Sequence, residues 1–399
     1  MPYDLSTRFV VGISSSALFD LEEEAKIFDE FGLQAFIDHQ RKFEDKFLEP
    51  GSAFLLIRGL LELNTDPHDP KLEVILMSQN HPDVCLRVFH SIKHHGLAIS
   101  RASLTGGAPL QPYLKAFKVK LFLSTSPEDV QDAANHGVAA SLIYSPPPNL
   151  RMYSGQVRVA FDGDCVLFSD QAQKIFDKER LPAFHEHESE HANEALPAGP
   201  FAPFLRFLAD NQGTDPKKSL FRVALITDRN APAHERAIKT LRSWNVRIDE
   251  AHFLGGVAKS DFLTAFEADI FFDDKPEYCK SASLLVPTGQ VFQPESEPSQ
   301  ITLRLETSTR NPNESFLVSC QKFLRGDFQK SKAEFSEWYR VKISDWPESA
   351  RDAFLRELDE SAVGTPKGKQ RRSTSPGNSP TDKLSAFLER LRLKHEPRS

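Results

Sequence analysis

The chain has 399 residues, of which 40% are hydrophobic and 26% are charged, a composition typical of a globular protein with about two to three domains. Its formal net charge of -7 argues against nucleic acid as the main partner, because a surface that follows phosphates is basic. It has no apolar run of the roughly 18 residues that a bilayer requires, no secretory signal at its start and only scattered cysteines, so we expect a cytoplasmic protein without a membrane partner.

Apolar runs alternate with helical patterns along most of the chain. We predict strands at 8–14, 72–78, 119–124, 157–162, 221–227 and 269–273, with helices between them, for example at 20–31 and 232–244. This alternation indicates an α/β fold with a parallel sheet, in which ligands bind outside the carboxyl ends of the strands.

Two segments of the chain repeat each other at an offset of 148 to 149 residues (26 to 174, 78 to 227). AKIFD at 25–29 reappears as QKIFD at 173–177, and EVILMS at 73–78 reappears as RVALIT at 222–227. We therefore predict two copies of one α/β unit, at 8–145 and 156–290, separated by the stiff connector Pro146–Pro148.

Polar side chains follow the predicted strands of the second copy. Asp162 and Asp164 flank a glycine at the end of one strand and would project together. Thr227 ends the next strand, Lys259 follows a glycine pair, and Asp273 and Asp274 end the last strand. One acid could attack a substrate while the other passes a proton beside a hard cation, although an Asp-Gly-Asp turn also closes ordinary hairpins.

The ordered set of an acid pair, a threonine, a lysine and an acid pair resembles the four motifs of the haloacid dehalogenase superfamily. Longer matches resemble the cytosolic 5'-nucleotidase type I family, over about residues 8 to 290: DGDCVLFSD at 162–170, TDRNAPAHER at 227–236, FLGG at 253–256, ADIFFDD at 268–274 and ISSSALFDL at 13–21. This resemblance implies two tandem haloacid dehalogenase-like (Rossmann-type) units with parallel sheets, and magnesium-dependent hydrolysis of AMP-like nucleoside 5'-monophosphates.

The chemistry of phosphoryl transfer assigns a role to each of these groups. Asp162 would attack phosphorus and form an aspartyl-phosphate, and Asp164 would act as general acid and base. Thr227 would donate a hydrogen bond to a phosphoryl oxygen, and Lys259 would add positive charge. As ligands of Mg²⁺ we expect Asp162, Asp164, Asp273 and Asp274.

The first copy lacks these groups. With an offset of 149, the second-copy residues fall on the following first-copy residues: Asp162 on Ile13, Asp164 on Ser15, Thr227 on Ser78, Lys259 on Leu110 and Asp273 on Ser124. We predict a degenerate, pseudo-catalytic unit that serves as a structural partner, a lid or an effector site. We also expect a homo-oligomer and regard a nucleotide effector as possible.

Between the first two motifs, residues 171–219 are predicted to insert a small helical cap. Phe176, Phe184 and Phe201 could stack on a base or belong to the core, and His185, His187 and His191 could bind zinc or form a solvated face. Of the residues that follow Thr227, one of Arg229, Asn230 and Arg236 is expected to contact phosphate or nucleoside.

The C-terminal part differs in composition from the repeats. We predict a partly helical extension at 291–362 and a disordered tail at 363–399 with a short amphipathic helix. Two alternatives to the nucleotidase remain open at this point: a phosphatase of another small phosphomonoester, and a non-catalytic nucleotide-sensing or scaffold protein.

Overall fold

The computed structural model describes residues 4–66, 68–151, 153, 155–171 and 186–295. Phe176, Phe184, His185 and the predicted extension and tail after residue 295 lie outside these ranges. Within the part of the chain that is described, no helix is long and apolar enough to cross a membrane.

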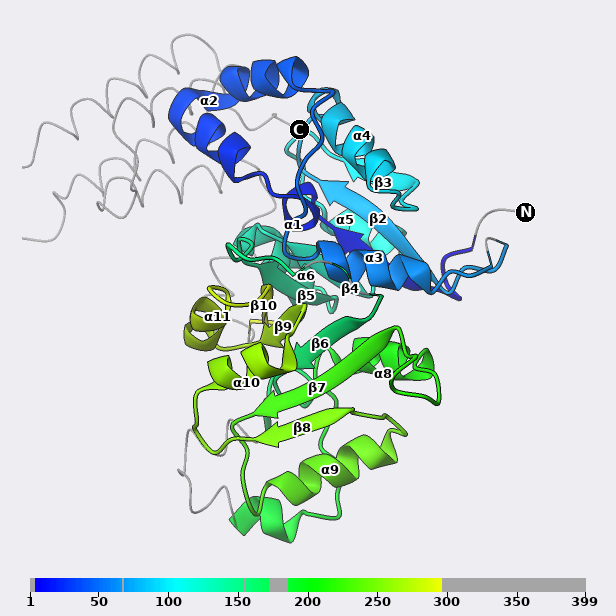
Figure 1. Cartoon of the computed structure of the whole chain (residues 1–399), viewed down its shortest axis with the longest axis vertical. Coiled ribbons are helices and arrows are strands. Elements are labelled where there is room, and N and C mark those ends of the chain that lie inside the picture. The colour runs from blue at the N-terminus through cyan, green and yellow to red at the C-terminus, as the bar shows by residue number, and fades with distance from the viewer. Residues whose placement is uncertain (1–3, 67, 152, 154, 172–185, 296–399) are drawn as a thin grey trace, which may run out of the picture. The chain divides into compact units, whose positions relative to one another are not determined.

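The structure confirms a mixed α/β fold (Figure 1). Its strands are β1 (Phe9–Ile13), β2 (Leu72–Ser78), β3 (Arg101–Leu104), β4 (Leu121–Ser124), β5 (Ala139–Ile143), β6 (Val157–Phe161), β7 (Phe221–Thr227), β8 (Glu250–Phe253), β9 (Ile270–Asp273) and β10 (Thr288–Val291). Its α-helices are α1 (Ser15–Leu18), α2 (Glu22–Lys42), α3 (Phe54–Glu62), α4 (Leu86–His94), α5 (Gln111–Ala116), α6 (Pro127–Asn135), α8 (Ala202–Asp210), α9 (His234–Ser243), α10 (Lys259–Phe266) and α11 (Pro276–Ala282).

All ten strands of the described ranges belong to one sheet, in the order β3-β2-β1-β4-β5-β10-β9-β6-β7-β8. Neighbouring strands are parallel except at one joint, where β5 and β10 pair antiparallel, with Leu142 opposite Gln290. The sequence predicts a separate parallel sheet for each copy, and the structure instead joins the two sets of strands edge to edge.

The strand order repeats as the sequence does. The order 3-2-1-4-5 in the first half becomes 8-7-6-9-10 in the second half. In β1, Ile13 lies beside Leu76 and Leu123, and in β6, Phe161 lies beside Leu225 and Phe272. Phe161 therefore corresponds to Ile13.

This register corrects two correspondences that were based on an offset of 149. At the first strand of each copy the offset is 148 (161 to 13), so Asp162 corresponds to Ser14 rather than Ile13. By the same offset, Asp164 corresponds to Ser16 rather than Ser15. The copies differ in length by one residue between their first and second strands, which shifts the later offset to 149.

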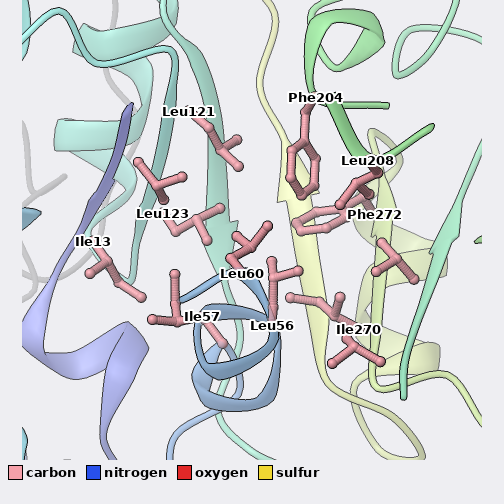
Figure 2. Packing of buried hydrophobic residues seen from close by; sticks show 14 of the residues in the cluster. Ile13, Leu56, Ile57, Leu60, Leu121, Leu123, Phe204, Leu208, Ile270 and Phe272 are labelled. Carbon is pink, nitrogen blue, oxygen red and sulfur yellow. The ribbon is translucent and has the colours of Figure 1, made fainter. Parts of the chain in front are cut away.

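One hydrophobic core spans the joint between the halves. In Figure 2, Leu56, Ile57 and Leu60 of α3 lie between first-half and second-half strands, which contribute Ile13, Leu121 and Leu123 on one side and Ile270 and Phe272 on the other. Helix α3 packs so closely on β6 that a Cβ atom at Gly59 would overlap Val157. The halves therefore share one core.

Helix α8 falls inside the predicted cap insertion at 171–219, yet it packs as core. Its residues Phe204, Leu205 and Leu208 are fully buried or nearly so, in the same cluster as the strands. Phe207 stacks on Phe9 of the first half, with ring centroids 4.6 Å apart. Helix α8 thus belongs to the hydrophobic core beside the sheet rather than to a cap over its edge.

Candidate active site

The predicted site residues meet at the carboxyl ends of three adjacent strands. Asp162 directly follows β6, Thr227 ends β7 and Asp273 ends β9, and β6 lies between the other two strands. The backbone N–H of Asp162 donates to the carbonyl oxygen of Phe272 at 2.8 Å, which extends the strand pairing to the site. The topology of the sheet brings these residues together as the sequence predicts.

Three carboxylates form a compact group at this edge. Oxygen atoms of Asp162, Asp273 and Asp274 all lie within 4.8 Å of one another. Lys259, the first residue of α10, donates from Nζ to Asp162 Oδ1 at 2.7 Å and to Asp273 Oδ2 at 2.6 Å. Asp162, Lys259 and Asp273 are all buried, so these charges interact with little screening from water.

Burial and crowding shift the ionisation of this group. Burial, with the nearby Asp273 and Asp274 carboxylates, raises the pKa of Asp162 to about 8, against the opposing effect of Lys259. Burial and then Asp273 raise the pKa of Asp274 to about 6. For Lys259, burial alone would lower the pKa, but the carboxylates of Asp162 and Asp273 outweigh it and raise the pKa.

The acid group fits a hard divalent cation. Three carboxylates face one lysine, so the group carries more negative than positive charge in a buried place. Asp274 Oδ1 is buried and has no hydrogen-bond partner within the described residues. Carboxylate oxygens are the ligands that Mg²⁺ prefers, and a divalent ion would offset the excess charge.

The turn after β6 places Asp162 close to Thr227. Gly163 accepts hydrogen bonds at its carbonyl oxygen from the N–H groups of Leu167 and Phe168, at 3.0 and 2.9 Å. A Cβ atom at Gly163 would lie 3.0 Å from Thr227 Oγ1, so a larger residue would force the hydroxyl to shift by a few tenths of an ångström. The close approach of the hydroxyl therefore favours glycine between the two acids.

Asp164 lies outside the acid group, contrary to its prediction as a metal ligand. Its carboxylate accepts two hydrogen bonds from Arg229, from Nε at 2.9 Å and from Nη2 at 2.7 Å. Arg229 also donates to Glu188, and Arg236 donates to the other oxygen of Glu188 at 2.8 Å. Both arginines, which were candidates for contact with phosphate, have their guanidinium groups bonded to protein carboxylates.

Glu188 is the member of this network that the sequence does not reveal. It is fully buried, although it stands in the charged stretch HEHESEH. Burial alone would raise the pKa of Glu188, but Arg229 and Arg236 outweigh it and lower the pKa. Its neighbours Glu186 and Glu190 have the same residue type, and nothing in the pattern marks the middle one as the buried acid.

The zinc and stacking alternatives find no support among the described residues. The rings of His187 and His191 stack with centroids 4.2 Å apart, and His191 Nδ1 bonds to the carbonyl oxygen of His187 at 2.8 Å. Phe201 is fully buried and packs against Phe272 at a centroid distance of 5.0 Å, so it belongs to the core.

Comparisons with known proteins identify the family of the chain. A family model described as 5'-nucleotidase matches residues 1–297. Cytosolic 5'-nucleotidase 1B of Homo sapiens is 34% identical over 287 residues, which cover 69% of this chain and 47% of that relative. The chain thus spans about half the length of this curated relative. No solved structure matches the chain. Because the family model covers well over half of the sequence, the chain belongs to the 5'-nucleotidase family.

Proposed function

We propose that this protein is a magnesium-dependent 5'-nucleotidase, which hydrolyses AMP-like nucleoside 5'-monophosphates to nucleoside and phosphate. The observation that carries the proposal is the convergence of the Asp162, Asp273 and Asp274 carboxylates within 4.8 Å, inside the region that the family model matches. The name of the human relative supports the substrate class and a cytoplasmic location.

Asp162 is the nucleophile of the proposed reaction. One of its carboxylate oxygens attacks phosphorus, the bond to the nucleoside oxygen breaks, and an aspartyl-phosphate forms, which water then hydrolyses. When bound to Asp162, Asp273 and Asp274, Mg²⁺ would neutralise the phosphate dianion that otherwise repels the attacking carboxylate. Lys259 holds Asp162 and Asp273 in place, at 2.7 and 2.6 Å, and contributes further positive charge.

Asp164 and Thr227 complete the set. Asp164 protonates the leaving nucleoside oxygen and later takes a proton from the hydrolytic water. Its side chain is 19% exposed, so it can reach a substrate at the edge of the sheet. Thr227 is buried beside Gly163 and donates its hydroxyl hydrogen to a phosphoryl oxygen.

The proposal includes the fold of two tandem haloacid dehalogenase-like units, of which only the second is catalytic. The repeated strand order supports the duplication. At the corresponding strand ends the first unit carries Ser14, Ser78 and Ser124, which offer no carboxylate for a cation.

Phosphate release by the full chain tests the proposal. We expect turnover of AMP and related nucleoside 5'-monophosphates with Mg²⁺, none with EDTA, and none from Asp162→Asn. Acid quenching during turnover, followed by mass spectrometry, should find phosphate on the peptide that contains Asp162.

Two results would replace the proposal with its alternatives. Preference for sugar phosphates over every nucleotide would indicate a phosphatase of another monoester. Binding of AMP without any phosphate release would indicate a sensor or scaffold protein.

A further inference from the structure

We infer that Arg229 and Glu188 are positioning residues for proton transfer: Glu188 orients Arg229, and Arg229 sets the carboxylate of Asp164 against the leaving group. This inference rests on the proposed function, because it concerns the general acid of that same reaction. It assigns a role to a buried charge network that the proposed chemistry does not otherwise use.

The contact between Arg229 and Asp164 fixes an orientation as well as a distance. The two bonds run from Nε and Nη2 to the two different oxygens of one carboxylate, at 2.9 and 2.7 Å. Such a two-bond pair defines the plane of the carboxylate, which a single hydrogen bond does not.

Arg229 makes further contacts in addition to those with Asp164. Its Nη1 donates to Glu188 and, at 3.3 Å, to the carbonyl oxygen of Ala233, while its guanidinium carbon lies 5.7 Å from the centre of the Phe168 ring. The side chains of Arg229 and Glu188 are 1% and 0% exposed. The arginine is therefore fixed before any substrate arrives.

Exposure to solvent distinguishes Asp164 from the other three charged groups of the network. Arg229, Glu188 and Arg236 are at most 3% exposed, whereas Asp164 is 19% exposed. The network thus presents one acid to solvent, two residues after the proposed nucleophile Asp162. Its arginine stands two residues after Thr227, so one loop carries both the phosphate-binding hydroxyl and the group that orients the acid.

Glu188 connects the segment between the first and second motifs to the orientation of Asp164. It lies in the stretch between β6 and β7 and bonds to Arg229 and Arg236. A change at Glu188 would reach the leaving group through Arg229 and then Asp164, without contact to the substrate.

The test compares two substrates that differ in their need for a proton. Without a proton, a nucleoside would have to leave as an alkoxide, which is a poor leaving group, so its departure requires the general acid. The nitrophenolate of p-nitrophenyl phosphate is a good leaving group and departs without one. In the full chain, Arg229→Lys keeps the charge but cannot form the two-bond pair. We expect kcat for AMP to fall about 10- to 100-fold with KM unchanged, and kcat for p-nitrophenyl phosphate to fall less than about threefold.

Two further variants serve as support and control. Glu188→Gln should also lower kcat for AMP more than kcat for p-nitrophenyl phosphate, but by a smaller factor than Arg229→Lys does. If thermal melting shows that Arg229→Lys does not fold, Glu188→Gln provides the test instead. Arg236→Lys alters a residue that bonds to Glu188 and to the carbonyl oxygen of Glu194 rather than to Asp164, and it should change the kcat of both substrates by the same factor.

An equal loss for both substrates, or no loss, in folded Arg229→Lys and Glu188→Gln would overturn the inference. Asp162→Asn separates this failure from failure of the proposed function. It should abolish turnover of both substrates whether or not Arg229 positions the acid.

Discussion

The carboxyl ends of the two half-sheets share one backbone plan and differ in chemistry. In the second half, Asp273 Oδ1 accepts a hydrogen bond from the N–H of Lys275 at 2.8 Å. In the first half, Ser124 Oγ accepts the equivalent bond from the N–H of Ser126 at 3.2 Å. Either side chain closes the turn after its strand. Only the carboxylate has a second oxygen left, which in Asp273 bonds to Lys259.

At the carboxyl edge of the first half, hydroxyl groups bond to one another. Ser14 Oγ and Ser16 Oγ lie 3.3 Å apart, and Ser16 Oγ bonds to Thr125. At the position of Lys259 stands Leu110, which is 2% exposed and belongs to an apolar cluster. The comparison shows that turn closure is retained at both edges, whereas the charge that a cation would bind is present at one.

The largest expected contrast between the halves is catalytic. Asp273→Asn should lower kcat with magnesium by about 1,000-fold or more, because it removes a proposed metal ligand, which corresponds to about 4 kcal/mol of transition-state stabilisation. The matched first-half variant Ser124→Ala should leave kcat unchanged. Phosphate release from AMP measures both, and a similar loss in the two variants would contradict the assignment of chemistry to the second half.

Lys259→Met should destabilise the metal-free protein by about 3–5 kcal/mol, because it leaves buried carboxylates without their cation. The matched variant Leu110→Met keeps an apolar side chain in the apolar cluster and should cost less than about 1.5 kcal/mol. Urea unfolding in EDTA measures both. Magnesium should restore part of the loss in Lys259→Met alone, and equal recovery in both variants would count against a cation at the acid group.

The acid group should also make stability depend on pH. An unfolded aspartate has a pKa of about 3.9, whereas that of Asp162 is raised to about 8 in the folded protein without metal. Folding therefore takes up a proton between these values, so the free energy of unfolding falls as pH rises across that window, by up to about 1.4 kcal/mol per pH unit. Asp162→Asn should remove this contribution, and magnesium should reduce it.

Urea unfolding at several pH values between 5 and 8, in EDTA, measures this slope. The equivalent first-half variant Ser14→Ala should keep it. Parallel pH dependences in wild type and Asp162→Asn would refute the predicted linkage.

The smallest effect concerns the joint between the halves. A Cβ atom at Gly289 would lie 2.8 Å from a ring carbon of Phe272 and overlap Ser141 Oγ, so Gly289→Ala should cost about 1–3 kcal/mol. Ser141→Ala removes an oxygen that has no hydrogen-bond partner within the described residues, and it should recover part of that loss. Unfolding free energies of the single and double variants measure the coupling, and strict additivity would show that the clash is not there.

The sequence predicts β1, β2, β4, β6, β7 and β9 because each is an apolar run. It does not reveal β3 and β8, which are the outermost strands of the sheet and have no fully buried residue, so no apolar run marks them. Strands β5 (AASLI) and β10 (TGQV) are buried but consist largely of small or polar residues. Because the joint is built from these two, the single sheet is not predictable from periodicity.

The acids of the site are predictable because each follows a strongly apolar strand. The partner of Asp164 is not predictable, since the contact between Arg229 and Asp164 joins residues 65 positions apart. Glu188 is equally hidden, because glutamates stand two residues before and two residues after it. The shift of one residue at Ser14 also escapes a repeat search, because Ser14, Ser15 and Ser16 are the same residue.

The antiparallel joint has the symmetry of a homodimer fused into one chain. Strands β5 and β10 occupy equivalent places in their halves, as a two-fold axis would require. The contacts across the joint are reciprocal as well, since Gly59 against Val157 and Phe207 against Phe9 involve the same pair of repeat positions (59 to 207, 9 to 157). One contact pairs a glycine with a valine, and the other pairs two phenylalanines. Each half supplies a sheet edge and a core helix to the other. The first half, which carries serines where the second carries its acids, therefore completes both the sheet and the hydrophobic core of the second half.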